Sequence, residues 1–150
     1  MPVRRLSCLL LLAAASCSEF PADPEGTLER IREQRVFRVG LIAPPGDGGI
    51  AAPAARLLQR VGQAAGARPR LERGEMEVLL HRLEEGEIDL VIGRFEAKSP
   101  WTGLVSLSPP LHKEKSGKAE FRLAAAMRNG ENAWIGLVER EARAVAPEAQ

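Results

Sequence analysis

The feature that most constrains the fold is an apolar strand directly after an amphipathic helix. Residues 88–93 (IDLVIG) are apolar except for Asp89, and such a run is typical of a strand covered on both faces, as in a parallel sheet. The segment before it, residues 75–86, is expected to be a helix that ends at Gly86. Its apolar side chains recur at helical spacing, at Met76, Leu79, Leu80 and Leu83. This pair predicts an α/β fold.

The other segments continue the alternation of helix and strand. Apolar periodicity predicts helices over residues 27–34, 50–66 and 129–145, and strands over residues 36–42, 67–72, 102–108 and 121–127. Loops are expected at 43–49 and 94–101, and a charged turn at 112–120. We expect Asn129 or Asn132 to cap the last helix and Trp134 to lie in the core. This order predicts a single three-layer α/β/α lobe with a mostly parallel sheet.

The first residues have the pattern of an export signal. Arg4 and Arg5 precede about ten apolar residues, which is too short a stretch to span a bilayer as a helix. The sequence AAASC is similar to the cleavage motif of bacterial lipoproteins, which would make Cys17 the lipidated residue. We therefore expect a signal peptide over 1–16 and an extended tether over 17–26. The alternative is plain secretion after cleavage near Ala15.

Composition and spacing argue against several classes of function. The formal net charge is +1, no basic run interleaves with aromatic residues, and there is no Tyr, so nucleic-acid binding has no support. The two histidines, His81 and His112, have no second ligand at metal-binding spacing. No nucleophile is accompanied by a base. We expect no enzymatic activity, no metal and no cofactor.

A dinucleotide-binding fingerprint is the main alternative to a non-enzyme. Residues 46–51 (GDGGIA) fit G-x-G-x-x-A between a strand and a helix, and Glu72 ends the next strand, where a ribose-binding acid would lie. Pro44 and Pro45 lengthen the turn, however, so that Gly46 does not follow the strand directly. A pyrophosphate site needs that tight turn. A nucleotide-dependent enzyme is therefore the less favoured hypothesis.

Gly93 ends the apolar run and Arg94 follows it, at the carboxyl end of the expected strand, where parallel strands in α/β sheets present ligand-binding groups. We expect Gly93 to let backbone approach a ligand or a tight turn, and Arg94 to hold a carboxylate or phosphate. The alternative for Arg94 is a surface ion pair with Glu96. Trp101 is either a lid over the sheet edge or a wall of a pocket. Asp89 is expected to accept hydrogen bonds from the preceding turn.

The order of three segments resembles bacterial extracellular solute-binding proteins of family 3, which have a periplasmic-binding-protein-like fold. Residues 27–46 look like the opening helix, strand and ligand-facing loop of that family. Residues 79–111 resemble its helix, Gly-x-Ile-Asp strand and Phe-Ser-x-Pro-like strand end. Residues 121–141 resemble its closing strand and helix. The family has a second lobe before the closing strand, but here only residues 112–120 fill that place.

The resemblance implies a single solute-binding lobe over residues 27–146, followed by a tail at 147–150. It departs from the amino-acid binders at residues 98–101 (KSPW), where Trp101 takes about the place of their carboxylate-binding arginine. The predicted solute site joins the loop at 43–49 to residues 93–101, through Pro45, Asp47, Gly93, Arg94, Phe95, Ser99 and Trp101.

The resemblance further implies a periplasmic or cell-surface protein, held to the membrane through Cys17, that takes a small polar or anionic solute weakly for an ABC-type uptake system. An ABC permease or a homodimer would be its protein partner. The alternative is an interaction lipoprotein that keeps the lobe as a scaffold and has lost the solute.

Overall fold

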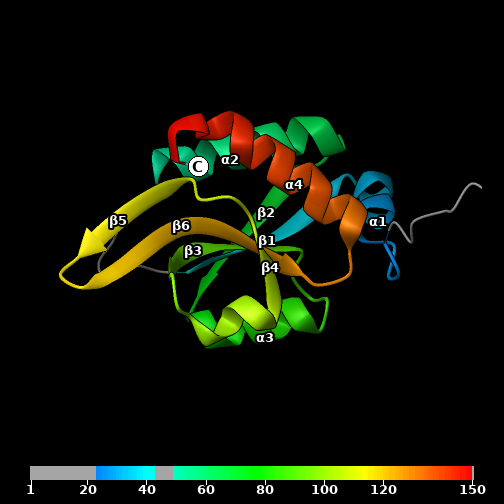
Figure 1. Ribbon diagram of the computed structural model, residues 1–150. Coiled ribbons are helices and arrows are strands. Elements are labelled where there is room, and N and C mark those ends of the chain that lie inside the picture. The colour runs from blue at the N-terminus through cyan, green and yellow to red at the C-terminus, as the bar shows by residue number, and fades with distance from the viewer. Residues whose placement is uncertain (1–22, 43–48, 150) are drawn as a thin grey trace, which may run out of the picture.

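The structure, a computed structural model, describes residues 23–42 and 49–149 (Figure 1). In chain order the elements are α1 (Thr27–Gln34), β1 (Val36–Ile42), α2 (Ala52–Ala65), β2 (Arg68–Gly74), α3 (Met76–Glu84), β3 (Leu90–Glu96), η1 (Pro100–Gly103), β4 (Val105–Leu107), β5 (His112–Ser116), β6 (Ala119–Arg128), α4 (Asn132–Val145) and η2 (Pro147–Ala149). The expected helices and strands are present, except for the differences described below. Cys17 and the expected signal peptide lie outside the described residues. In the described ranges, no helix has both the length and the apolar character needed to cross a bilayer.

One mixed sheet with strand order β2-β1-β3-β6-β4 forms the middle layer, and β5 pairs with β6. Strands β2, β1 and β3 run parallel, whereas β6 is antiparallel to β3, β4 and β5. Helices α2 and α4 cover one face and α3 covers the other (Figure 1). This arrangement confirms the predicted α/β lobe, with the parallel part of the sheet at its core.

Two apolar clusters hold the layers together. The larger joins the sheet to α1, α2 and α4, and Trp134 is fully buried in it, as expected. Its ring lies 5.8 Å from the ring of Phe37 between centroids, and its Nε1 donates to the backbone oxygen of Asp89 at 2.7 Å. The smaller cluster packs α3 against the opposite face of β3 and β6 through Leu79, Leu80, Leu83, Ile88, Val91 and Phe95. Both faces of β3 are therefore covered, as its apolar sequence predicts.

The prediction that this strand ends at Gly93 is wrong, because β3 continues to Glu96. Antiparallel pairing with β6 carries it on, with Gly93 opposite Ala124 and Glu96 opposite Phe121. A Cβ added at Gly93 would lie 2.2 Å from Cδ1 of Ile42. The absence of a side chain at Gly93 thus makes room for a neighbouring strand's side chain.

The charged turn expected over residues 112–120 is instead a β-hairpin. Strand β5 pairs with the first half of β6, and a two-residue turn at Gly117 and Lys118 joins them. Gly117 has φ 60°, which suits the first central position of a tight hairpin turn. Every residue of β5 is exposed, so the strand has no buried face that apolar alternation could reveal. The hairpin projects from the body of the lobe (Figure 1).

The end of the expected tether is part of the fold. Residues 23–26 form a turn in which the amide of Gly26 donates to the backbone oxygen of Asp23 at 3.0 Å. One carboxylate oxygen of Asp23 accepts from the amide of Leu28 in α1. The other accepts from the amides of Ala133 and Trp134 in the first turn of α4. Asp23 therefore satisfies amides at the start of both helices.

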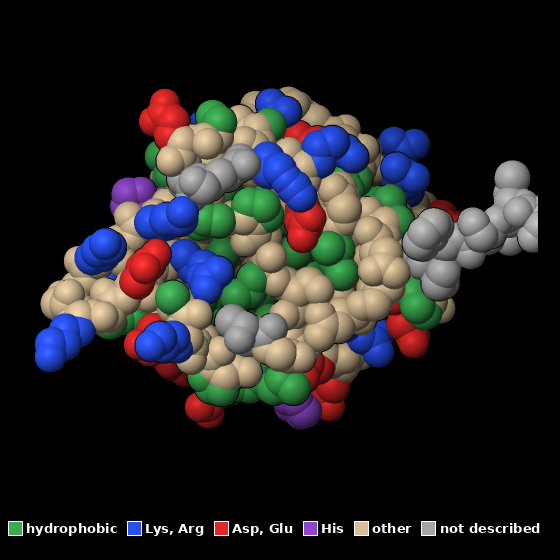
Figure 2. All heavy atoms as spheres, viewed as in Figure 1, with side chains coloured by type: hydrophobic (Ala, Val, Ile, Leu, Met, Phe, Trp, Pro, Cys, Tyr) green, Lys and Arg blue, Asp and Glu red, His purple; other side chains and the backbone are tan. Residues whose placement is uncertain are grey.

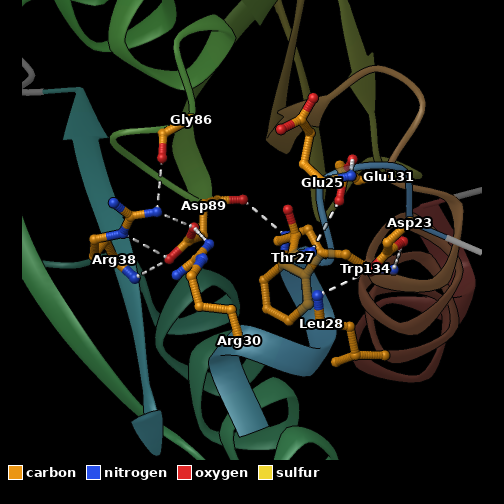
Figure 3. A network of polar contacts seen from close by, with 10 residues as sticks. All are labelled: Asp23, Glu25, Thr27, Leu28, Arg30, Arg38, Gly86, Asp89, Glu131 and Trp134. Carbon is orange, nitrogen blue, oxygen red and sulfur yellow. Dashed lines mark hydrogen bonds and ion pairs between the residues drawn. The ribbon is translucent and has the colours of Figure 1, made fainter. Parts of the chain in front are cut away.

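Glu131, just before α4, caps the start of α1 in return. It occupies the N-cap position of α4, in place of the expected Asn129 or Asn132, and makes no side-chain cap bond to its own helix. Its carboxylate instead accepts from the backbone amides of Glu25 and Thr27, each at 3.0 Å (Figure 3). The first turns of α1 and α4 are thus capped by acidic side chains more than 100 residues apart in the sequence.

Candidate functional site

A hollow of about 200 Å³ lies where β1 ends and α2 approaches. We call it the Arg94 hollow, and its lining comprises Leu41, Ile42, Gly49, Ile50, Ala51, Ala54, Arg73, Ile92, Gly93, Arg94 and Leu123. It lies at the carboxyl ends of two neighbouring parallel strands, which is where open α/β sheets bind ligands. The lining is an apolar floor with two arginines, and none of its described residues is acidic.

Arg94 stands at the boundary between the hollow and the hairpin. Its Nε lies 3.4 Å from a carboxylate oxygen of Glu114 on β5, and its guanidinium carbon lies 4.0 Å above the ring centre of Phe121 on β6. The partner of Arg94 in this ion pair is Glu114, whereas the sequence suggested Glu96 as the alternative. Both members of the pair are about half exposed, so the ion pair is weak and a competing anion can replace it.

The structure brings together part of the predicted site. Gly93 and Arg94 line the hollow, whereas Phe95 points to the opposite face and is fully buried in the α3 cluster. Ser99 is buried and accepts from the amide of Trp101 at 3.4 Å, which places it at the start of η1. Trp101 packs against the α3 cluster, away from the described lining of the hollow. Pro45 and Asp47 lie outside the described residues.

Sequence reasoning missed Arg73 and the apolar floor. Arg73 is the last residue but one of the weakly patterned β2, which pairs in parallel with β1 so that Arg73 lies opposite Leu41. Ile50 comes from the segment just before α2, and Leu123 comes from β6. The carboxyl ends of neighbouring parallel strands lie at the same end of a sheet. The strand order β2-β1-β3 would therefore have indicated Arg73 as a lining residue. A single sequence does not give that order.

Asp89 belongs to a structural network. It is 4% exposed, and its carboxylate accepts from the backbone amide of Arg38 at 2.7 Å, from the guanidinium of Arg38 at 2.7 and 3.1 Å, and from that of Arg30 at 2.5 Å (Figure 3). The prediction that it bonds to the preceding turn is wrong. That turn contributes the backbone oxygen of Gly86, which accepts from Arg38. Every donor comes from within the fold.

A second, larger hollow of about 680 Å³ lies at the opposite end of β1 and β2. We call it the Arg35 hollow; it is lined by Gln34, Arg35, Val36, Leu58, Gln59, Gly62, Gln63, Gly66, Ala67, Arg68 and Pro69. Most of its polar side chains are exposed, and it adjoins the amino ends of the parallel strands. The smaller Arg94 hollow is therefore the better candidate, because its position and apolar floor match those of ligand sites in α/β folds.

The acid of the dinucleotide fingerprint has a different partner. Glu72 forms an ion pair with Arg82 of α3, which also contacts Glu87. These contacts raise the pKa of Arg82, chiefly through the hydrogen bond that Arg82 donates to Glu87. Burial has a smaller opposing effect, and Glu72 raises the pKa further. Glu72 therefore contributes to the packing of α3 on β2.

Solved structures of solute-binding proteins share this fold. A point mutant of the arginine-bound form of domain 1 from TmArgBP is 16% identical, with a TM-score of 0.65 over 79% of this chain and 97% of that chain. An ancestral cationic amino acid solute binding protein is 12% identical, with a TM-score of 0.63 over 79% of this chain and 93% of that chain. An amino acid ABC transporter substrate-binding protein from Streptococcus pneumoniae Canada MDR_19A, bound to L-arginine, is 9% identical, with a TM-score of 0.64 over 79% and 91%.

These similarities confirm the predicted solute-binding-protein-like lobe as a fold. The match to an isolated domain 1 over nearly all of its length shows that one lobe accounts for the described architecture. No protein-family model matches the sequence, and no curated protein matches it.

Proposed function

We propose that this chain is an exported, lipid-anchored solute-binding lobe that takes a small anionic solute in the Arg94 hollow. The observation that carries the proposal is the placement of two arginines, Arg73 and Arg94, around an apolar floor at the carboxyl ends of β1 and β2. A guanidinium can bind a carboxylate through paired hydrogen bonds, and two of them beside one small hollow favour negative charge. The N-terminal pattern ending at Cys17 supports export and anchoring.

The charge of the hollow separates this chain from the proteins whose fold it shares. The names of those proteins refer to arginine or to cationic amino acids. Here the described lining contains two arginines and no acidic side chain, which favours an anionic solute over a cationic one. We therefore infer a different solute class, such as a short dicarboxylate or an acidic amino acid, delivered to an ABC-type permease.

The size and openness of the site set the expected affinity. A volume of about 200 Å³ is below the usual range for drug-sized ligands, and a single lobe encloses a solute from one side. We expect dissociation constants of the order of 0.1–1 mM, which correspond to about 4–5.5 kcal/mol of binding free energy.

Calorimetry on the full chain with succinate, L-glutamate and L-arginine tests the proposal. We expect at least one of the two anions to bind and L-arginine to bind at least about tenfold more weakly. Replacing Arg94 by Ala should weaken the anion by about tenfold or more, since charge-assisted hydrogen bonds contribute about 1.5–3 kcal/mol.

The matched control is Arg32→Ala, which removes the same charge from the exposed last turn of α1, at the amino end of β1. It should leave the affinity unchanged. Preferential binding of L-arginine, or an anion affinity that does not change in Arg94→Ala, would refute the assignment of the site.

A further inference from the structure

We propose that the free edge of β2 pairs with β2 of a second copy of this chain, in antiparallel register about Leu71. Among the described strands, β2 lies at the end of the sheet and its only strand partner is β1. Leu71, in the middle of the strand, is 44% exposed and is one of the few large apolar side chains exposed on the described surface. A strand edge with an exposed leucine at its centre is a surface to which another strand can add.

The direction of the backbone groups shows what this edge offers. The amide of Arg68 donates to the backbone oxygen of Arg35 at 2.9 Å, so Arg68 faces β1. Because alternate residues of a parallel strand face the same neighbour, Pro69, Leu71 and Arg73 direct their backbone groups to the free edge. Pro69 has no amide hydrogen, and such an outward position is where a sheet tolerates proline. The amide and carbonyl of Leu71 can therefore pair with another strand.

The side chains of β2 complement a second copy in one register. Antiparallel pairing centred on Leu71 places Leu71 opposite Leu71 of the second copy, where each backbone can donate to the other. It also places Arg70 opposite Glu72 of the second copy, and the same pair recurs through the two-fold symmetry. Opposite charges on directly opposed residues stabilise an antiparallel pair. Contacts of this isologous kind are those that closed dimers use.

The two neighbouring registers are less favourable, because each opposes like charges at its centre. In the register centred on Arg70, Arg70 faces Arg70 and Leu71 faces Pro69, which has no amide to donate, although Arg68 then faces Glu72. In the register centred on Glu72, Glu72 faces Glu72. Like charges on opposed residues destabilise a sheet. Glu72 also pairs with Arg82 of its own chain, so in the dimer one carboxylate would lie between two guanidiniums, as Asp89 does inside the lobe.

Strand β5, which lies with β4 at the opposite edge of the sheet, does not fit a second copy in the same way. Its antiparallel pairing about Glu114 would place Glu114 opposite itself and Lys113 opposite Lys115. The charges of β5 therefore oppose self-pairing, whereas those of β2 favour the register about Leu71. This contrast favours β2 as the contact between copies.

The contact would also bear on the Arg94 hollow, a consequence that rests on the proposed function. Arg73 lines that hollow, and the pairing places it opposite Pro69 of the second copy, which belongs to the Arg35 hollow there. The second copy would thus add a wall beside the solute. The dimer itself does not depend on the identity of the solute.

Sedimentation equilibrium of the full chain over a range of concentrations tests the pairing. An interface of this small size is expected to give a dissociation constant of the order of 10–100 µM. Arg70→Glu should weaken the dimer at least about tenfold, because at both ends of the pairing the new carboxylate would face Glu72 of the other copy. Glu72→Arg should do the same with two basic side chains. Arg32→Glu, the charge reversal on α1, should leave it unchanged.

Mixing the two variants is the decisive measurement. Arg70→Glu paired with Glu72→Arg restores opposite charges at both ends, so the mixture should form a heterodimer about as tight as the original dimer. If Glu72→Arg fails to fold for want of its contact with Arg82, Leu71→Asp tests the same edge and should give monomers. A chain that is monomeric at 1 mM, charge variants that dimerise normally, or a mixture that stays monomeric would overturn the proposal.

Discussion

Replacing Glu131 by Gln should lower the free energy of unfolding by about 2–4 kcal/mol at pH 7. The buried carboxylate accepts from two backbone amides, those of Glu25 and Thr27, each at 3.0 Å. Glutamine has the same shape but only one acceptor oxygen, so one of these amides would face an NH2 group. A hydrogen bond to a charged group contributes about 1.5–3 kcal/mol, and a buried donor left unpaired costs about 1–3 kcal/mol.

The pH dependence of this loss is a second signature. Burial raises the pKa of Glu131, but hydrogen bonds from Thr27 and Glu25 and the charge of Arg128 outweigh it, so the pKa lies below its ordinary value of 4.5. A carboxylate with a lowered pKa in the folded state stabilises the fold fully above its unfolded pKa and loses that contribution as the pH falls through the folded value. The difference between Glu131 and Gln should therefore narrow below about pH 4.5.

Urea denaturation followed by circular dichroism at pH 7 and pH 3 measures both effects. The matched control is Glu139→Gln on the same helix, where the carboxylate pairs with Arg143 four residues along and is about one-third exposed. That change should cost less than about 0.5 kcal/mol. A loss below about 1 kcal/mol for Glu131→Gln at pH 7, or an equal loss at both pH values, would refute the capping role.

Three further changes test other parts of the lobe. Gly93→Ala should lower the free energy of unfolding by about 1–3 kcal/mol in urea titrations, because the new Cβ meets Ile42. Adding Ile42→Ala in the same chain should cancel part of that cost. Additive losses in the double variant would contradict the clash. Asp89→Asn should cost about 2–3 kcal/mol by the same titration, as it leaves two partly exposed guanidiniums without their charge partner; a neutral effect would contradict the network. Glu114→Gln should tighten anion binding about two- to fourfold in calorimetry by releasing Arg94, and weaker binding would show that Glu114 supports the site.

The sequence was sufficient to predict the layers of the lobe. The apolar run at residues 88–93 indicates a strand covered on both faces, and β3 is buried between the two clusters as that pattern requires. The helical spacing of Leu79, Leu80 and Leu83 places one face of α3 on the sheet. These patterns are local, so a single sequence contains them. The similar solved structures agree with the resulting fold.

The missed features depend on contacts between distant segments. Asp23 caps a helix 110 residues away, and no spacing rule links the two. Gly93 lacks a side chain because of Ile42 on β1, which becomes relevant only once β1 and β3 are known to be neighbours. The hairpin at β5 was missed because both of its faces are exposed, and its charged residues then show no apolar alternation.

The buried polar side chains of the described residues find their partners within the lobe. Among the described residues, no buried side-chain nitrogen or oxygen lacks a hydrogen-bond partner, and Asp23, Glu131 and Asp89 close the termini and the sheet with internal partners. The hairpin turn at Gly117 joins β5 to β6 at the point where the resemblance places a second lobe. A missing lobe would therefore affect the enclosure of a solute more than the stability of the fold. Solute affinity, and its dependence on a second copy at β2, is consequently the property in which this chain should differ most from two-lobed proteins.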